Sequence, residues 1–241
     1  MSPPEEAGHQ ALIGEKFTAG RALVQSLSLW FRNLVLFLVT GLLAQFPLVL
    51  VTALRRPLPT ARARILVTLV QCVMLCLATG TISHSVLEQL RGRHPGLMAS
   101  LAAGSARTWM LFAALGSTVL LTAGASLFLV VPGILCAVRW CLVPPIVVAE
   151  GRGDPRERSS GLTEGHGWAI LGLLLTLLVA ALVLTALLVA LGPDAGFVGF
   201  FVGAMLPLGV FLSFGAVLLA VSYHLLRSEK EGDLEVVEVF R

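Results

Sequence analysis

Arg139 is the residue whose position in the sequence most strongly suggests a functional role. It lies well inside the apolar run of residues 134–149, which contains no Asp or Glu. A charge at the centre of a membrane helix costs about 2.5–3.5 kcal/mol on insertion scales, so a compensating group is expected. Backbone carbonyls near Pro132 or Pro144, a lipid phosphate or other anion, and water in a transport path would each serve, and snorkelling to the interface is the alternative. Arg139 and Trp140 are therefore the candidate lipid or anion contacts.

The other residues that commonly carry chemistry form no recognised catalytic or metal site. Cys72 and Cys76 share a helical face, either as small packing residues or as a soft-metal or redox pair. The sequence has no phosphate-binding loop, no zinc-protease motif and no serine-hydrolase elbow. Its arginines form no aromatic-interleaved patch of the kind that binds nucleic acid. We therefore predict no catalytic residue, no cofactor, no metal and no nucleic-acid partner.

The amino-acid composition indicates that this chain is a membrane protein. Of 241 residues, 56% are hydrophobic and 13% are charged, and the mean hydropathy is +0.89. Soluble domains carry about 25% charged residues. A hydrocarbon core about 30 Å thick needs about 20 apolar residues per helix, and the chain supplies several such runs. The sequence predicts an all-α fold, a polytopic transmembrane helical bundle.

The apolar runs predict about six spans within a single transmembrane domain. This domain covers residues 17–227, between a mobile N-terminal tail at 1–16 and a short C-terminal tail at 228–241. The C-terminal tail alternates apolar and acidic residues, which predicts a strand. The predicted spans are 34–54, 65–84, 111–131, 134–149, 168–191 and 197–226.

Short amphipathic segments precede spans one, three and five. Residues 17–33 have an apolar and a polar face, which predicts an interfacial helix, with a polar start of the first span as the alternative. Residues 97–110 are weakly amphipathic. Asp154, Pro155 and Glu157 fit the start of a third short helix that ends near residue 163. This pattern favours three units of an interfacial helix and a hairpin, with independent hairpins as the alternative.

Proline and glycine predict where the spans break and pack. Pro132 and Gly133 are expected to end span three, and the prolines at 144–145 should kink or split span four. Pro207 should bend the sixth span. Small residues permit close contact between membrane helices. The predicted packing residues of the sixth span are Gly199, Gly203 and Pro207.

The distribution of Arg and Lys predicts the orientation. With both termini in the cytoplasm, the tails and the loops at 85–110 and 150–167 place most basic residues inside. The loop between the first two spans is the exception. It would hold four arginines on the outside, namely Arg55, Arg56, Arg62 and Arg64.

Residues 129–170 also contain an ordered series of motif residues, namely Pro132, Gly133, Arg139, Trp140, Pro144 or Pro145, Glu150, Gly151, Arg158, Ser159, Leu162, Thr163, Gly165 and Trp168. This segment resembles the membrane domain attached to some glycerophosphodiester phosphodiesterases and the related YciC-like inner-membrane proteins. One departure is Gly161, where a larger helix-forming residue is common, and it should weaken the short helix before span five.

The resemblance implies a six-pass protein of the bacterial cytoplasmic (inner) membrane, in a family mostly without assigned activity. The phosphodiesterase activity of the fused relatives belongs to a separate soluble barrel of some 250 residues, so it does not transfer to this chain.

The sequence leaves more than one function open. The first hypothesis is a non-catalytic membrane protein that organises lipid or partner proteins. The alternative is a small transporter or channel for an anionic or amphipathic solute, using Arg139 and the broken fourth helix. A membrane enzyme with its acid and base at the interface is the third. The expected partners are membrane lipids, with a membrane-protein partner or a homo-oligomer also open.

Overall fold

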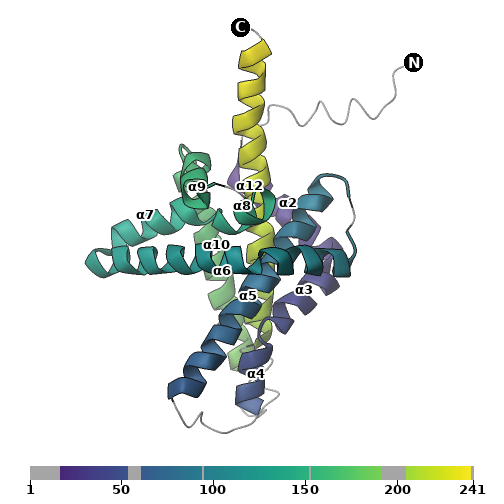
Figure 1. The fold of residues 1–241 in the computed structure, drawn as a ribbon, viewed down its shortest axis with the longest axis vertical. Coiled ribbons are helices and arrows are strands. Elements are labelled where there is room, and N and C mark those ends of the chain that lie inside the picture. Colours follow the sequence, from purple (N-terminus) through teal and green to yellow (C-terminus); the bar gives the residue numbers. More distant parts are fainter. Residues whose placement is uncertain (1–16, 54–60, 94, 152, 192–204, 240–241) are drawn as a thin grey trace.

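The computed structural model describes residues 17–53, 61–93, 95–151, 153–191 and 205–239, and these residues contain helices and no strand (Figure 1). The all-α prediction is confirmed. The helices are α2 (Ala19–Arg32), α3 (Leu34–Leu43), α4 (Phe46–Ala53), α5 (Ala61–Leu90), α6 (Leu97–Phe128), α7 (Val130–Trp140), α8 (Val143–Ala149), α9 (Pro155–Thr163), α10 (Gly167–Leu191) and α12 (Leu206–Val239).

Several of these helices are long and apolar enough to cross a membrane. Among the described residues, five segments meet this criterion, and six do if the bent pair of α2 and α3 counts as one span. The chain is therefore a multi-pass membrane protein. The predicted start of the sixth span, with Gly199 and Gly203, lies outside the described residues.

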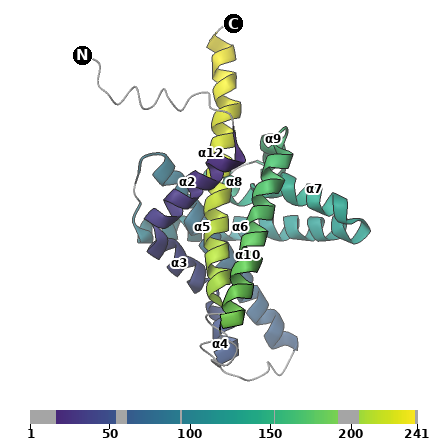
Figure 2. The same cartoon turned by 180° about the vertical axis from the view of Figure 1, so that it is seen from behind.

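Helix α12 forms the centre of the bundle. It runs along the long axis of the molecule, with α10 beside it (Figures 1 and 2). One face buries Val217 and Val221 against Trp30, Phe37 and residues of α5. Another face buries Leu218, Tyr223 and Leu226 against α8, α9 and α10. In its most apolar window 61% of the residues are buried, against 11% for α10, so α12 is the core helix and α10 faces lipid.

Close packing in the described part of α12 centres on Gly209. A Cβ built on Gly41 of α3 would lie 2.5 Å from the carbonyl oxygen of Gly209. No side chain fits that gap, so the two backbones meet only because both residues are glycine. Pro207 is buried in the first turn of α12, where the described helix begins, and the segment that a bend would join to it is not described.

The first predicted span is broken in the middle. Helix α3 ends at Leu43, and α4 begins at Phe46 with Pro47 in its first turn, where a missing N–H costs no hydrogen bond. The side-chain amide of Gln71 donates to the carbonyl oxygen of Ala44 at 2.8 Å, which satisfies an acceptor at the break. The prediction of one continuous helix over residues 34–54 is therefore wrong.

The amphipathic segment 17–33 is a separate helix, as predicted. Helix α2 meets α3 at an angle of 87°, which excludes a straight polar start of the first span. It buries Ala22, Ser26 and Trp30 against the bundle and exposes Val24 and Phe31.

The second amphipathic segment is not a separate helix. Residues 97–110 and the predicted third span form the continuous helix α6, because nothing in the segment interrupts the backbone hydrogen bonds. The following break lies at Leu129, which is extended, three residues before the predicted turn. Pro132 instead occupies the first turn of α7, which tolerates a residue without an N–H.

Span four is split, as the two prolines predicted. Helix α7 ends at Trp140 and α8 begins at Val143, with Pro144 and Pro145 buried in its first turn. The predicted C-terminal strand is wrong, because α12 continues to Val239. An ion pair between Arg227 Nε and Glu231 Oε2 at 2.6 Å, one helical turn apart, supports this extension.

Candidate functional site

Five polar side chains meet at one end of the bundle, and we call them the Glu150 cluster: Glu150, Arg158, Tyr223, Arg227 and Glu231. Glu150 Oε1 accepts hydrogen bonds from Tyr223 Oη at 2.8 Å and from Arg158 Nε at 3.2 Å. Arg158 also pairs with Glu231. Arg227 donates to Tyr223 Oη at 3.2 Å and to Glu231. The cluster therefore joins the loop after α8 and helix α9 to α12.

The charged side chains of this cluster form ion pairs with one another. Partial burial lowers the pKa of the Arg158 guanidinium, but its hydrogen bonds to Glu231 and Glu150 outweigh this and raise the pKa overall. Each arginine of the cluster has a carboxylate partner, so its charge is already compensated within the protein. We conclude that the Glu150 cluster positions α9 and is structural.

The loop between α8 and α9 brings Arg158 to this cluster. Gly151 has a φ of +63°, a conformation that other residues rarely adopt, and it turns the chain after Glu150. Asp154 caps α9 by accepting a hydrogen bond from Arg156 N at 2.9 Å, with Pro155 at the first helical position. The predicted start and end of this short helix are confirmed, and Gly161 does not interrupt it.

The cap at Asp154 gives a pH-dependent prediction. The hydrogen bond from Arg156 N lowers the pKa of the Asp154 carboxyl below its ordinary value of 3.8. A depressed carboxyl pKa stabilises the folded form above the unfolded pKa and loses that effect as the pH falls through the folded pKa. We expect the Arg156 amide to lose hydrogen-exchange protection in that acid window. In Asp154→Ala the Arg156 amide should be unprotected at every pH, whereas in Asp154→Asn it should stay protected throughout the acid window. Protection that persists in Asp154→Ala would refute the cap.

The C-terminal end of α9 is held by α12. Lys230 Nζ donates to the carbonyl oxygens of Gly161 and Glu164, which are acceptors left open at a helix end. A third contact joins α9 to α7, because Ser159 Oγ donates to the carbonyl oxygen of Arg139 at 2.7 Å. Helix α9 is thus fixed against both neighbours.

Arg139 itself lies in the last turn of α7, beside α9, with its side chain exposed. It lines a cavity of about 490 Å³ between the two helices, which we call the Arg139 cavity. Among the described residues, its guanidinium has no hydrogen-bond or ion-pair partner, in contrast to Arg158 and Arg227. Trp140 is half-buried and packs against the core cluster. The cavity is lined by Leu135, Val138, Arg139, Glu157, Ser160, Gly161, Thr163, Glu164, Gly165 and Gly167.

The structure brings some of the predicted motif residues together and separates others. Glu150, Arg158 and Ser159 meet around α9 and join it to α7 and α12. Gly133 lies at the far end of α7, where a Cβ would collide with Ser126 of α6. Trp168 is 87% exposed at the start of α10. The motif therefore marks the packing of α9 more than a single binding site.

Sequence reasoning missed the members of the site that belong to α12. Tyr223, Arg227 and Glu231 follow one another at intervals of four residues, so they share one helical face. That spacing was the available signal, and the predicted C-terminal tail obscured it. Cys72 and Cys76 are free thiols, and among the described residues no three His, Cys, Asp or Glu side chains could jointly hold a metal ion.

Comparisons with protein-family models, with curated proteins and with solved structures found no match to this chain.

Proposed function

We propose that the protein is a non-catalytic membrane protein that organises lipid by binding a phospholipid headgroup in the Arg139 cavity. The observation that carries this proposal is the contrast between three arginines at one end of the bundle. Arg158 and Arg227 bind carboxylates, whereas Arg139 lines a cavity without a described partner.

The chemistry of the cavity suits a phosphodiester. A guanidinium presents several donors in a planar fork that matches phosphate oxygens and is weakly hydrated compared with an ammonium. The aliphatic residues Leu135 and Val138 line the same cavity and belong to α7, so an acyl chain could leave the headgroup along that helix. Arg139 at the end of α7 then lies between apolar and polar surroundings, where phosphates of a bilayer are found.

Two carboxylates narrow the choice of headgroup. Glu157 and Glu164 are exposed and line the cavity together with Arg139. They would repel a purely anionic ligand but attract an ammonium group. The arrangement therefore favours an aminophospholipid such as phosphatidylethanolamine, with its phosphate at Arg139 and its amine near the carboxylates.

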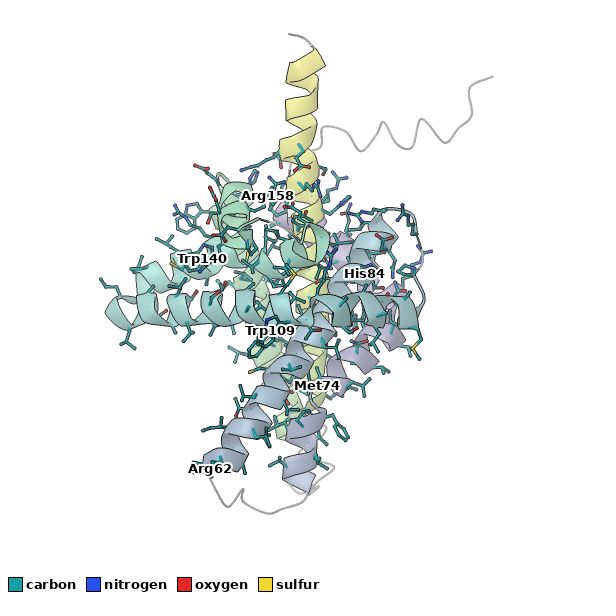
Figure 3. The ribbon with its side chains drawn as sticks, viewed as in Figure 1. Arg62, Met74, His84, Trp109, Trp140 and Arg158 are labelled. Atoms are coloured by element: carbon teal, nitrogen blue, oxygen red, sulfur yellow. The ribbon has the colours of Figure 1, made fainter. Side chains whose placement is uncertain are left out.

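We also propose that the end of the bundle that carries α9 faces the bacterial cytoplasm, with both termini on that side. Figure 3 places Arg158 at this end and Arg62 at the opposite end. The supporting feature is the excess of basic residues at this end of the bundle. The described basic residues that support this orientation are Arg91, Arg93, Arg156, Arg158, Arg227 and Lys230.

Substitution of Arg139 tests the lipid site. We expect Arg139→Ala to reduce the retention of phosphatidylethanolamine by about tenfold, because a hydrogen bond to a charged group contributes about 1.5–3 kcal/mol. Arg139→Lys should keep part of the retention, since the charge remains but the fork is lost. Native mass spectrometry of protein from mixed-lipid nanodiscs measures bound lipid directly.

Matched variants separate this site from general electrostatics. Arg62→Ala removes the same charge at the opposite end of the bundle and should leave retention unchanged. Replacing Glu157 and Glu164 by glutamine should shift retention from phosphatidylethanolamine toward phosphatidylglycerol. Equal retention in Arg139→Ala and the native protein would remove the proposal. Arg139-dependent flux of a soluble organic anion into proteoliposomes, without lipid retention, would replace it with the transport alternative.

A further inference from the structure

Helices α6 and α7 form a hairpin that projects from the bundle, and we call its residues 108–138 the α6–α7 arm. Figures 1 and 2 show the arm running across the direction of α12 and α10, with the connection between α6 and α7 away from the body. Leu129 joins the two helices and forms this tip. In the most apolar window of α6 only 11% of the residues are buried. Most of the α6 surface in the arm is therefore not covered by the rest of the protein.

The charge pattern identifies those surroundings as lipid. Residues 108–138 contain no charged side chain, while Arg107 and Arg139 stand at the two ends of the segment. Trp109 is 75% exposed, and Figure 3 shows it on the side of α6 that faces away from Arg158. The hydroxyl of Thr118 donates to the carbonyl oxygen of Ala114 at 2.7 Å, so it presents no open donor to an apolar medium.

The exposed residues of α6 cover a broad part of its circumference, as lipid contact requires. Val119, Leu120 and Leu121 are consecutive and are 64%, 75% and 48% exposed. Successive residues of a helix point about 100° apart, so these three cover more than half of the circumference. A single protein partner would cover one stripe, whereas acyl chains contact every side.

The base of the arm fixes its direction relative to the spans. Gly104 of α6 crosses Thr81 of α5 so closely that a Cβ would lie 2.8 Å from the backbone nitrogen of Thr81. Arg107 Nη1 donates to the carbonyl oxygen of Val147 in the last turn of α8 at 3.4 Å. At the tip, Gly133 packs against Ser126 and keeps the two helices together. The crossing is thus built into helix contacts on both sides of the hairpin.

We infer that the α6–α7 arm does not cross the membrane but lies within the leaflet on the α9 side. With α12 and α10 along the membrane normal, the arm runs parallel to the bilayer plane. Its apolar residues then contact the acyl chains of one leaflet, and Arg107 and Arg139 reach the phosphates of that leaflet. This inference does not depend on the proposed lipid site, because it concerns the orientation of the arm alone.

Accessibility of the tip tests the inference. In a chain whose native cysteines are replaced by alanine, Leu129→Cys is probed with a membrane-impermeant maleimide from each side of the membrane. Arg93→Cys and Ala61→Cys serve as controls for the α9 side and the opposite side. We expect Leu129→Cys to remain unlabelled from either side, while each control is labelled from its own side only.

A depth measurement completes the test. A spin label at Leu129→Cys should lie at acyl-chain depth in the α9-side leaflet, short of the bilayer centre. Labelling from the Ala61 side, or a depth beyond the centre, would show that the hairpin spans and would overturn the inference. Cross-linking of Leu129→Cys between two copies would overturn it in favour of a dimer contact. If the cysteine-free chain fails to fold, an azide-bearing residue at position 129 of the native chain carries the same label.

Discussion

Replacing Gly41 by leucine is expected to lower the free energy of unfolding by about 3 kcal/mol, at the upper end of the usual cost of overpacking. A Cβ at this position would lie 2.5 Å from the carbonyl oxygen of Gly209, which belongs to a backbone and cannot rotate away. The whole of α3 would have to move from α12, the core helix. Unfolding in mixed micelles, followed by circular dichroism as the share of dodecyl sulfate rises, measures the loss.

Gly172→Leu provides the matched control. Gly172 is also within an apolar helix, α10, but a Cβ there meets nothing within 4 Å. The same substitution should therefore change stability by less than about 1 kcal/mol, the helix-propensity difference of glycine. Equal effects of the two substitutions would show that α3 and α12 do not meet through Gly41 and Gly209.

The second large effect is expected for Glu150→Ala, at about 2 kcal/mol. Tyr223 is 1% exposed and donates its hydroxyl to Glu150 Oε1, so the substitution leaves a buried donor without its charged acceptor. Arg158 loses one of its two carboxylate partners at the same time. Thermal unfolding in detergent, compared with native protein at the same pH, gives the change.

A double-substitution cycle assigns this loss to the buried hydroxyl. Tyr223→Phe removes the donor and should cost about 1 kcal/mol. In the double variant Glu150→Ala with Tyr223→Phe, no buried donor is left unpaired. The combined loss should therefore fall short of the sum of the two single losses by about 1 kcal/mol. Strict additivity would contradict the hydrogen bond on which the Glu150 cluster depends.

Features set by neighbouring residues could be predicted from the sequence. Asp154 and Pro155 define the start of α9 through backbone geometry within one turn, and the prediction was confirmed. The split between α7 and α8 followed in the same way from the prolines at 144–145. Helix α2 was found because its amphipathic period is local.

Features set by contacts between distant residues could not be predicted from the sequence. The direction of α6 depends on Gly104 meeting Thr81 of another helix, so residues 97–110 looked like a separate interfacial segment. Glu150 and Tyr223 are 73 residues apart, and nothing near either residue indicates that they bind each other. The extension of α12 likewise depends on Lys230 and Glu231 contacting α9, which outweighed the alternating pattern of the tail.

The Arg139 site combines a feature that the local sequence predicts with one that depends on distant contacts. The isolation of Arg139 in an apolar run marked it as a residue that needs a partner, and the structure places it beside a cavity of about 490 Å³. The two carboxylates of the same cavity are Glu157, in helix α9, and Glu164, the residue that directly follows this helix. Only the fold shows that the candidate site holds both signs of charge.

The most direct test of a lipid site is a structure of the protein in nanodiscs that contain phosphatidylethanolamine. We predict density for a phosphate within hydrogen-bond distance of the Arg139 guanidinium, with an acyl chain running along α7. A guanidinium bound only to protein carbonyl or carboxylate oxygens, or facing a continuous water-filled passage, would contradict it.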